Sequence, residues 1–174
     1  MGWSSYVTST PNRELERIRA EQRAKRNKLD NCITQTNPIV KEIEQINLKI
    51  DKANQVVQQV KQIPPLVESS CTMLGAMGSQ LQKGLKVNGV VAGTTVSSES
   101  TSIPAGISAD VNNLVLKVQE YVSIKNQEGN IKKEQLESLK RQYNAILNSS
   151  PSTLGIYGPA PTFPNIPEIK TFQG

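Results

Sequence analysis

The side chains that could carry chemistry in this chain are two cysteines, several closely spaced carboxylates and a basic cluster, and histidine is absent. Without histidine there is no Ser–His or Cys–His nucleophile pair, no histidine metal ligand and no imidazole general base. The carboxylate pairs, such as Glu14 with Glu16 and Glu134 with Glu137, lie among lysines and arginines, which is typical of a solvated helix face. We therefore expect no catalytic residues and no enzyme activity.

Motifs for cofactors and metals are also missing from the sequence. Neither a GxGxxG fingerprint nor a Gly–Lys–Ser/Thr phosphate loop occurs. Cys32 and Cys71 have neither a metal-type spacing nor a disulfide framework, so we interpret them as small buried thiols in a reducing compartment. The sequence predicts no cofactor and no metal site.

A basic cluster at residues 13–28 is the one feature that could bind an anion such as phosphate. The chain has a net charge of +5, and the candidate anion-binding residues are Arg17, Arg19, Arg23 and Arg26. However, the basic residues are scattered around the predicted helix, three acids lie among them, and no aromatic residue interrupts them for base stacking. Nucleic acid is therefore an alternative partner that the sequence does not favour.

Aromatic residues concentrate in the two terminal segments, 1–9 and 149–174. Five of the seven aromatics lie there, and these candidate partner-binding residues are Trp3, Tyr6, Tyr157, Phe163 and Phe172. Disordered linkers normally avoid aromatics, and prolines stiffen the C-terminal segment into an extended chain. We interpret the aromatics as anchors on a neighbouring subunit, while docking on the chain's own helices stays open as the alternative.

A helical apolar seam runs through the first third of the chain. Thr10-Pro11 is typical of a helix start, Asn37-Pro38 predicts a kink, and Pro64-Pro65 ends a first arm at 10–62. Apolar or small residues recur at 3- and 4-residue spacing from Leu15, and the spacing includes the polar Gln22, Lys25 and Thr36. The most apolar part of this seam comprises Ile39, Ile43, Ile46, Ile50, Val57 and Val60.

A second arm is predicted at 108–148, with a break or kink at Glu128-Gly129-Asn130. Its candidate seam comprises Val111, Val115, Val118, Val122, Leu136 and Leu139. Between the arms, residues 66–86 predict a short helix and the Gly/Ser/Thr-rich stretch 87–107 predicts a loop. The short helix is expected to gather on one side Leu66, Ser70, Met73, Leu74, Met77, Leu81 and Leu85.

Together these elements predict a mainly α protein. The two seams match if the arms fold back on each other as an elongated antiparallel helical hairpin or coiled coil, with extended tails at 1–9 and 149–174. An apolar content of 36% suits a narrow seam better than a thick globular core. We expect no signal peptide, no membrane-spanning segment and no membrane partner.

The favoured function is a non-enzymatic structural protein that bridges the subunits of a large assembly. A virion capsid or tail is the favoured assembly, and the expected location is a virion or an intracellular assembly. One alternative is a helical-hairpin partner or chaperone of a type VII-like secretion system, although the chain lacks the Trp-x-Gly turn of such hairpins. Another is a nucleic-acid-associated scaffold. Homo-oligomers also fit the sequence, because polar seam residues such as Gln22 and Lys25 suit a dimer as well as an intramolecular pair.

Overall fold

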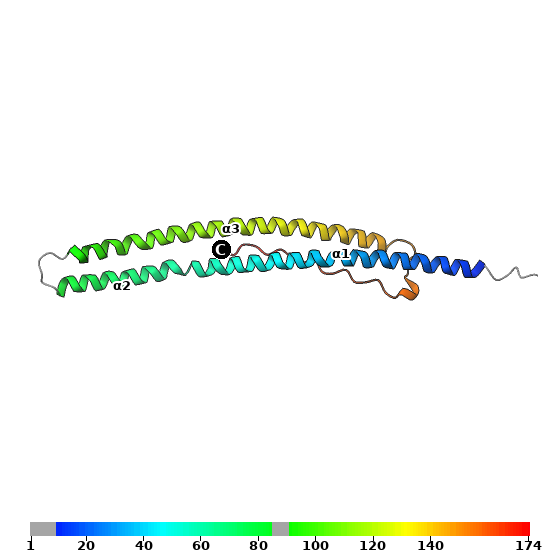
Figure 1. The fold of residues 1–174 in the computed structure, drawn as a ribbon, viewed down its shortest axis with the longest axis horizontal. Coiled ribbons are helices and arrows are strands. Elements are labelled where there is room, and N and C mark those ends of the chain that lie inside the picture. The colour runs from blue at the N-terminus through cyan, green and yellow to red at the C-terminus, as the bar shows by residue number, and fades with distance from the viewer. Residues whose placement is uncertain (1–9, 85–90) are drawn as a thin grey trace, which may run out of the picture. The chain divides into compact units, whose positions relative to one another are not determined.

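In the residues that it describes, a computed structural model of the protein contains three α-helices and one short 3-10 helix. It describes residues 10–84 and 91–174, and the side chains of 12–80 and 103–174. The helices are α1 (Thr10–Val60), α2 (Ile63–Gly84) and α3 (Val91–Leu147), followed by η1 (Gly155–Tyr157), and the described residues include no strand. Figure 1 labels α1, α2 and α3 along the chain. The predicted fold class, a mainly α helical hairpin, is confirmed.

The prolines differ in their effect on the helices. Pro38 lies inside α1, which continues past it, so the break that a proline can cause does not occur there. Pro64 and Pro65 lie in the first turn of α2. A helix tolerates proline there because the first turn needs no donor from those N–H groups.

The predicted loop at 87–107 and the predicted arm start at Ser108 are wrong from Val91 onward, because α3 begins at Val91. Residues 87–90 lie outside the described residues. The predicted break near Gly129 is also absent, since α3 continues to Leu147. Gly, Ser and Thr disfavour a helix by only about 0.5–1 kcal/mol each, so a composition rich in them does not exclude one.

The chain divides into two compact units. Unit 1 comprises residues 1–46 and 128–169, and unit 2 comprises 47–127 and 170–174. In unit 1, the partners of α1 run backwards along α3: Lys25 contacts Leu147, Leu29 packs with Tyr143, and Glu42 pairs with Lys132 at 2.6 Å. The two helices of unit 1 are therefore antiparallel.

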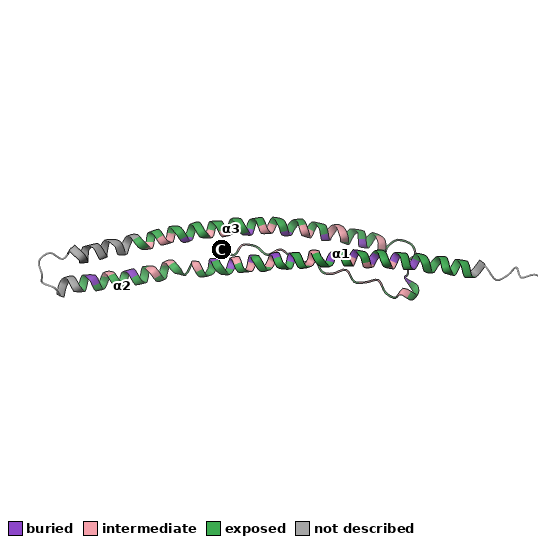
Figure 2. Cartoon of the chain, viewed as in Figure 1, coloured by how far each residue is buried: buried purple, intermediate pink, exposed green. Residues whose placement is uncertain are grey.

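The predicted seam of α1 lies on the buried side of the helix. From Gln22 to Val60 each seam position is buried or half-buried, and Figure 2 shows the buried positions recurring along α1. The seam positions of α3, from Val111 to Ile146, are likewise buried or half-buried. Leu15 and Ile18 are exposed, because α3 ends beside Lys25 and leaves no helix next to the first turns of α1.

Thr36 is a polar residue at a fully buried seam position, and its hydroxyl donates to the carbonyl of Ile33 in the same helix at 2.7 Å. We expect Thr36→Val to leave the free energy of unfolding unchanged or to raise it by about 1 kcal/mol, because the helix keeps its backbone bonds and a methyl replaces the hydroxyl. Chemical denaturation followed by circular dichroism measures this. A large loss of stability would mean that the hydroxyl has a second role.

Candidate interaction surfaces

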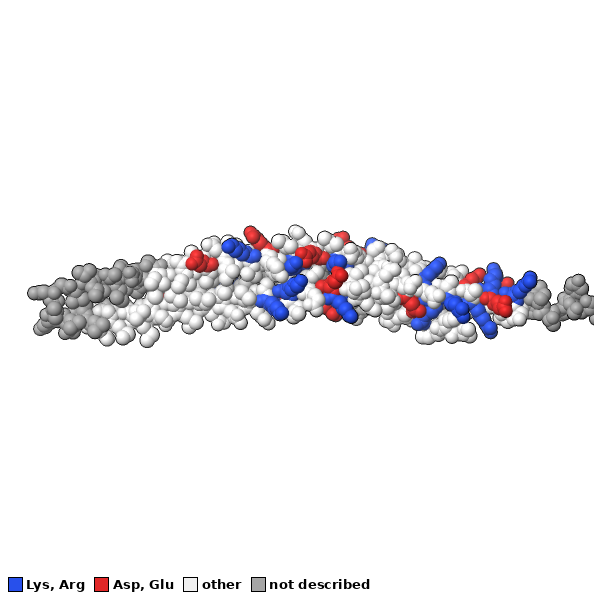
Figure 3. All heavy atoms as spheres, viewed as in Figure 1, with Lys and Arg blue, Asp and Glu red and all other residues white. Residues whose placement is uncertain are grey.

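The arginines of the basic cluster mostly have partners within the chain. Arg17 pairs with Glu14 at 2.6 Å and with Glu21 at 3.8 Å, and these carboxylates raise the pKa of Arg17, with the hydrogen bond that Arg17 donates to Glu14 the largest cause. Figure 3 shows acidic side chains interspersed among the basic ones on the visible face. Arg19 is exposed. Carboxylates interspersed in this way reduce the positive potential that a phosphate group would meet.

Arg23 and Arg26 hold the segment that follows α3. Arg23 donates to the hydroxyl of Tyr157 at 3.1 Å, and its guanidinium lies 5.8 Å from the centre of that ring. Arg26 donates to the carbonyls of Pro159 at 2.5 Å and Tyr157 at 3.2 Å while it pairs with Asp30 at 3.0 Å. Two of the four predicted anion-binding residues therefore bind the protein's own C-terminal segment.

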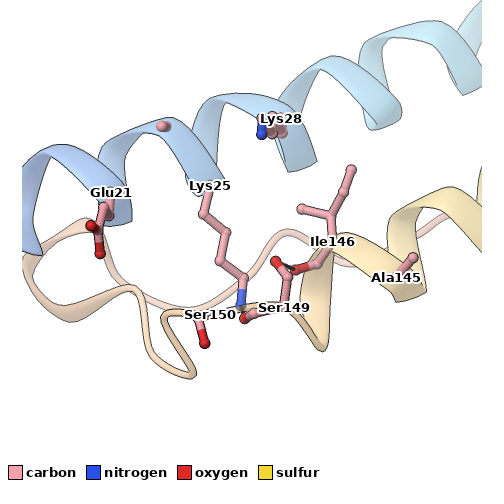
Figure 4. A pocket seen from close by; sticks show the side chains of 8 residues that line it. Glu21, Lys25, Lys28, Ala145, Ile146, Ser149 and Ser150 are labelled. Carbon is pink, nitrogen blue, oxygen red and sulfur yellow. Dashed lines mark hydrogen bonds between the residues drawn. The ribbon is translucent and has the colours of Figure 1, made fainter.

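Lys25 fixes the point where the chain leaves α3. Its ammonium donates to the carbonyl oxygens of Leu147, Ser149 and Pro151, each at 2.7 Å, and the residue is 5% exposed. Figure 4 shows the side chain extending from α1 toward Ser149 and Ser150. The last carbonyls of a helix lack intrahelical partners and carry partial negative charge, so a cation is well placed there. All three ammonium protons have an acceptor.

The C-terminal segment also buries apolar side chains against unit 1. Leu154 is buried in one cluster with Leu29, Cys32 and Tyr143. The rings of Tyr143 and Phe163 lie 5.5 Å apart at 60°, and the Tyr143 hydroxyl donates to the carbonyl of Pro161. The partly buried side chains around this cluster are Ile33, Ile146, Tyr157, Ala160 and Phe163.

The predicted partner-binding aromatics are thus only partly available for a partner. Tyr157 and Phe163 pack on the chain's own helices, which is the alternative that the sequence left open. Phe172 is half-buried in unit 2. Trp3 and Tyr6 lie outside the described residues.

Tyr143 should titrate later than an ordinary tyrosine. Burial raises the pKa of its phenol above 10.0, the charge of Arg26 opposes this, and Cys32 adds to it. Because the folded pKa lies above the unfolded value, the stabilisation is fully present below about pH 10 and is lost as pH rises through the folded pKa. Ultraviolet absorbance titration should show one late phenol that Tyr143→Phe removes. If the variant leaves the late transition in place, the assignment is wrong.

A row of four polar side chains on α1 binds the C-terminal segment in unit 2. These residues, called here the polar ladder, are Asn47, Asp51, Asn54 and Gln58. Asn47 accepts from the backbone N–H of Lys170 at 2.9 Å, and Asp51 accepts from the Lys170 ammonium at 2.5 Å. Gln58 donates to the carbonyl of Gln173 at 3.3 Å.

Asn54 is the central member of the polar ladder and is 7% exposed. Its amide donates to the carbonyl of Thr171 and accepts from the N–H of Gln173, both at 3.0 Å. One side chain therefore makes the two hydrogen bonds that a neighbouring β-strand would make to an extended backbone. The sequence analysis did not identify the polar ladder. Each of its members directly follows a seam position, and successive members are four, three and four residues apart.

Large apolar side chains of α2 lie on its exposed side, called here the α2 face. Its members Leu66, Met73, Leu74 and Met77 are 67%, 66%, 56% and 59% exposed. The buried or half-buried positions of α2 are instead mostly small: Pro64, Val67, Cys71, Gly75 and Gly78. Of the large residues that the sequence groups on one side of this helix, these four are exposed rather than buried, whereas the side chain of Leu81 and the whole of Leu85 lie outside the described residues.

Charge is sparse where the apolar face lies. Residues 62–109 carry four charged side chains, namely Glu68, Lys83, Lys86 and Glu99, whereas 10–60 carry seventeen. On the face shown in Figure 3, the described part of α2 has neither blue nor red atoms. A surface without charge favours contact with another apolar surface over contact with water.

Metal and membrane sites are not indicated in the part of the chain that the structure describes. No group of histidine, cysteine, aspartate or glutamate there could hold a metal ion, and Cys32 and Cys71 are free, buried thiols. Within the same residues, no helix combines the length and the apolar character needed to cross a bilayer. No protein family, curated protein or solved structure with which the chain was compared matches it.

Proposed function

We propose that this protein is a non-enzymatic structural component of a large assembly and that it binds another subunit through the α2 face. The observation that carries the proposal is the exposure of Leu66, Met73, Leu74 and Met77, each more than half exposed. Monomeric proteins rarely expose a contiguous apolar patch of this kind unless it binds something. A virus or phage particle is the assembly that we favour.

The spacing of the α2 face suits a helical partner. Leu66, Ser70, Met73 and Met77 follow one another at intervals of four, three and four residues, which forms a stripe along one side of the helix. Methionine side chains adapt their shape to irregular apolar partners. A lipid surface fits less well, because Glu68 is the only charged residue between 63 and 80 and no lysine or arginine there could bind anionic headgroups.

Sedimentation of the full chain in an extract of its source cells tests the proposal. The wild-type chain should co-sediment with particles far larger than its own 19.1 kDa. The triple variant Leu66→Gln, Met73→Gln, Met77→Gln should stay in the light fractions, because glutamine leaves the partner's apolar side without a match. A matched control replaces three exposed polar residues of the same helix, with Ser69→Gln, Thr72→Gln and Ser79→Gln, and should sediment like the wild type.

Photo-crosslinking identifies what covers the α2 face in those particles. The chain has three methionines, at positions 1, 73 and 77, so photo-methionine places two of its three reactive groups on this face. Crosslinks should join Met73 and Met77 to one subunit of the particle in constant proportion. A wild-type chain that sediments only as a light species, or a triple variant that still enters the particles, would contradict the proposal.

A further inference from the structure

The polar ladder recognises main-chain atoms more than side chains. Of its five hydrogen bonds to residues 170–173, four go to backbone N–H or carbonyl groups, and only the Asp51 bond goes to a side chain. Backbone groups are the same in every residue except proline, so such a site accepts an extended segment for its shape and direction. Asp51 adds one requirement, a lysine at the position of Lys170.

The site is spread over three turns of α1 and has room beside the segment. A pocket of about 430 Å³ is lined by Asp51, Asn54, Gln55, Gln58, Gln59 and Gln173. Except for Gln173, these side chains belong to α1, and all of them are polar or charged. The surface next to Gln173 can therefore hydrogen-bond to an approaching chain.

Individual contacts at the ladder are weak enough to open. The side chains of Lys170 and Asp51 are 52% and 38% exposed, and ion pairs exposed to this degree add little to stability. The Gln58 bond is exposed and 3.3 Å long. Only Asn54 is buried. Release of residues 170–174 from their own ladder therefore breaks two exposed contacts that water can replace, and the two bonds to Asn54 are its main polar cost.

We propose that the polar ladder binds residues 170–174 of a second copy of this chain, so that copies exchange their C-terminal segments. The contact within one chain shows that this segment fits the polar ladder. Lys170 pairs with Asp51, and the extended backbone at Thr171 and Gln173 hydrogen-bonds to Asn54. An exchanged segment makes the same contacts in the second copy, and an identical element passes between chains at low cost. The exchange is a second interaction surface, separate from the α2 face.

Carbodiimide crosslinking of an isotope mixture tests the exchange in the unmodified full chain. This reagent joins an amine to a carboxylate only where the two are in contact, as Lys170 and Asp51 are at 2.5 Å. Equal amounts of chain labelled with ¹⁴N and ¹⁵N are mixed, equilibrated at high concentration and crosslinked, and the peptides are analysed by mass spectrometry. We expect Lys170–Asp51 products in which one peptide carries ¹⁴N and the other ¹⁵N.

Lys132 and Glu42 provide the internal control, because they pair at 2.6 Å between α3 and α1 of one hairpin. Their crosslink should stay unmixed. If the Lys170–Asp51 product is also unmixed, each chain keeps its own segment and the proposal is wrong. Mixing at both pairs overturns it as well, since whole hairpins would then exchange.

A variant at the ladder separates specific exchange from random association. Asn54→Leu should lower the yield of the mixed Lys170–Asp51 product several-fold, because both backbone bonds to Thr171 and Gln173 are lost. Gln45→Leu, another amide-to-leucine change at an exposed position of α1, should leave the yield unchanged. An unchanged Lys132–Glu42 yield shows that each variant is folded. Equal mixed yields in the two variants would exclude the ladder as the binding site.

Discussion

Replacement of Lys25 by methionine is expected to lower the free energy of unfolding by about 2–4 kcal/mol. The methionine keeps most of the apolar stem but removes the ammonium, which donates to three carbonyls at 2.7 Å. Three partly buried carbonyls then lose their donor together, and an acceptor left without a donor costs about 1–3 kcal/mol where water cannot reach it. Urea denaturation followed by circular dichroism measures the loss.

Lys28→Met is the matched control for Lys25→Met. Lys28 lies one turn farther along α1 and is exposed. Its replacement should change the free energy of unfolding by no more than about 0.5 kcal/mol. Hydrogen exchange adds a local readout: in Lys25→Met the amides of Tyr157 and Gly158, which bond to Leu154 and Gly155, should exchange faster. Equal stability losses in the two variants would show that the carbonyl contacts are not what holds this turn.

The seams of α1 and α3 could be predicted because burial repeats with the helix period. Ile43, Ile50 and Val122 are fully buried, at positions that the 3-4 spacing selected. The polar residues Gln22, Lys25 and Thr36 occupy the same buried stripe, so the period marked the position even where the residue type is polar. A strict helical repeat therefore identifies the buried face of a helix even where some residues on that face are polar.

Which side of α2 is buried could not be predicted from the helix period. An amphipathic pattern shows which residues share a side, and it is usual for the larger apolar side to face the core. Here the core-facing side carries Cys71, Gly75 and Gly78, and small residues let helices approach closely. The small residues therefore take the buried positions of α2, and Met73 and Met77 lie on the exposed side.

The docking of the C-terminal segment could not be predicted for another physical reason. Composition identified Tyr157 and Phe163 as anchors, but an anchor has the same residue type whether its pocket belongs to its own chain or to a neighbour. The contacts that decide the question run from Arg26 and Lys25 to backbone carbonyls of residues 147–159. Every residue has a backbone carbonyl, so the residue types do not show which carbonyls act as acceptors.

Leu29→Ala is expected to cost about 2–5 kcal/mol of unfolding free energy. Leu29 is fully buried and packs with Cys32, Tyr143 and Leu154, so it joins both helices of unit 1 to the segment that follows them. Alanine leaves a cavity at a point where three parts of the chain meet. The loss is measured by urea denaturation, and the fluorescence of the tyrosines near this cluster should change at a lower urea concentration.

Leu15→Ala is the matched control for Leu29→Ala. Leu15 occupies the same predicted seam of α1 two heptads earlier, but it is 52% exposed, whereas Leu29 is 0% exposed. Leucine and alanine have similar helix propensities, so the two substitutions differ mainly in the apolar contact that is lost. We expect Leu15→Ala to change the free energy of unfolding by no more than about 0.5 kcal/mol. If it costs as much as Leu29→Ala, then another chain covers the first turns of α1 in solution, and the seam continues into an intermolecular contact.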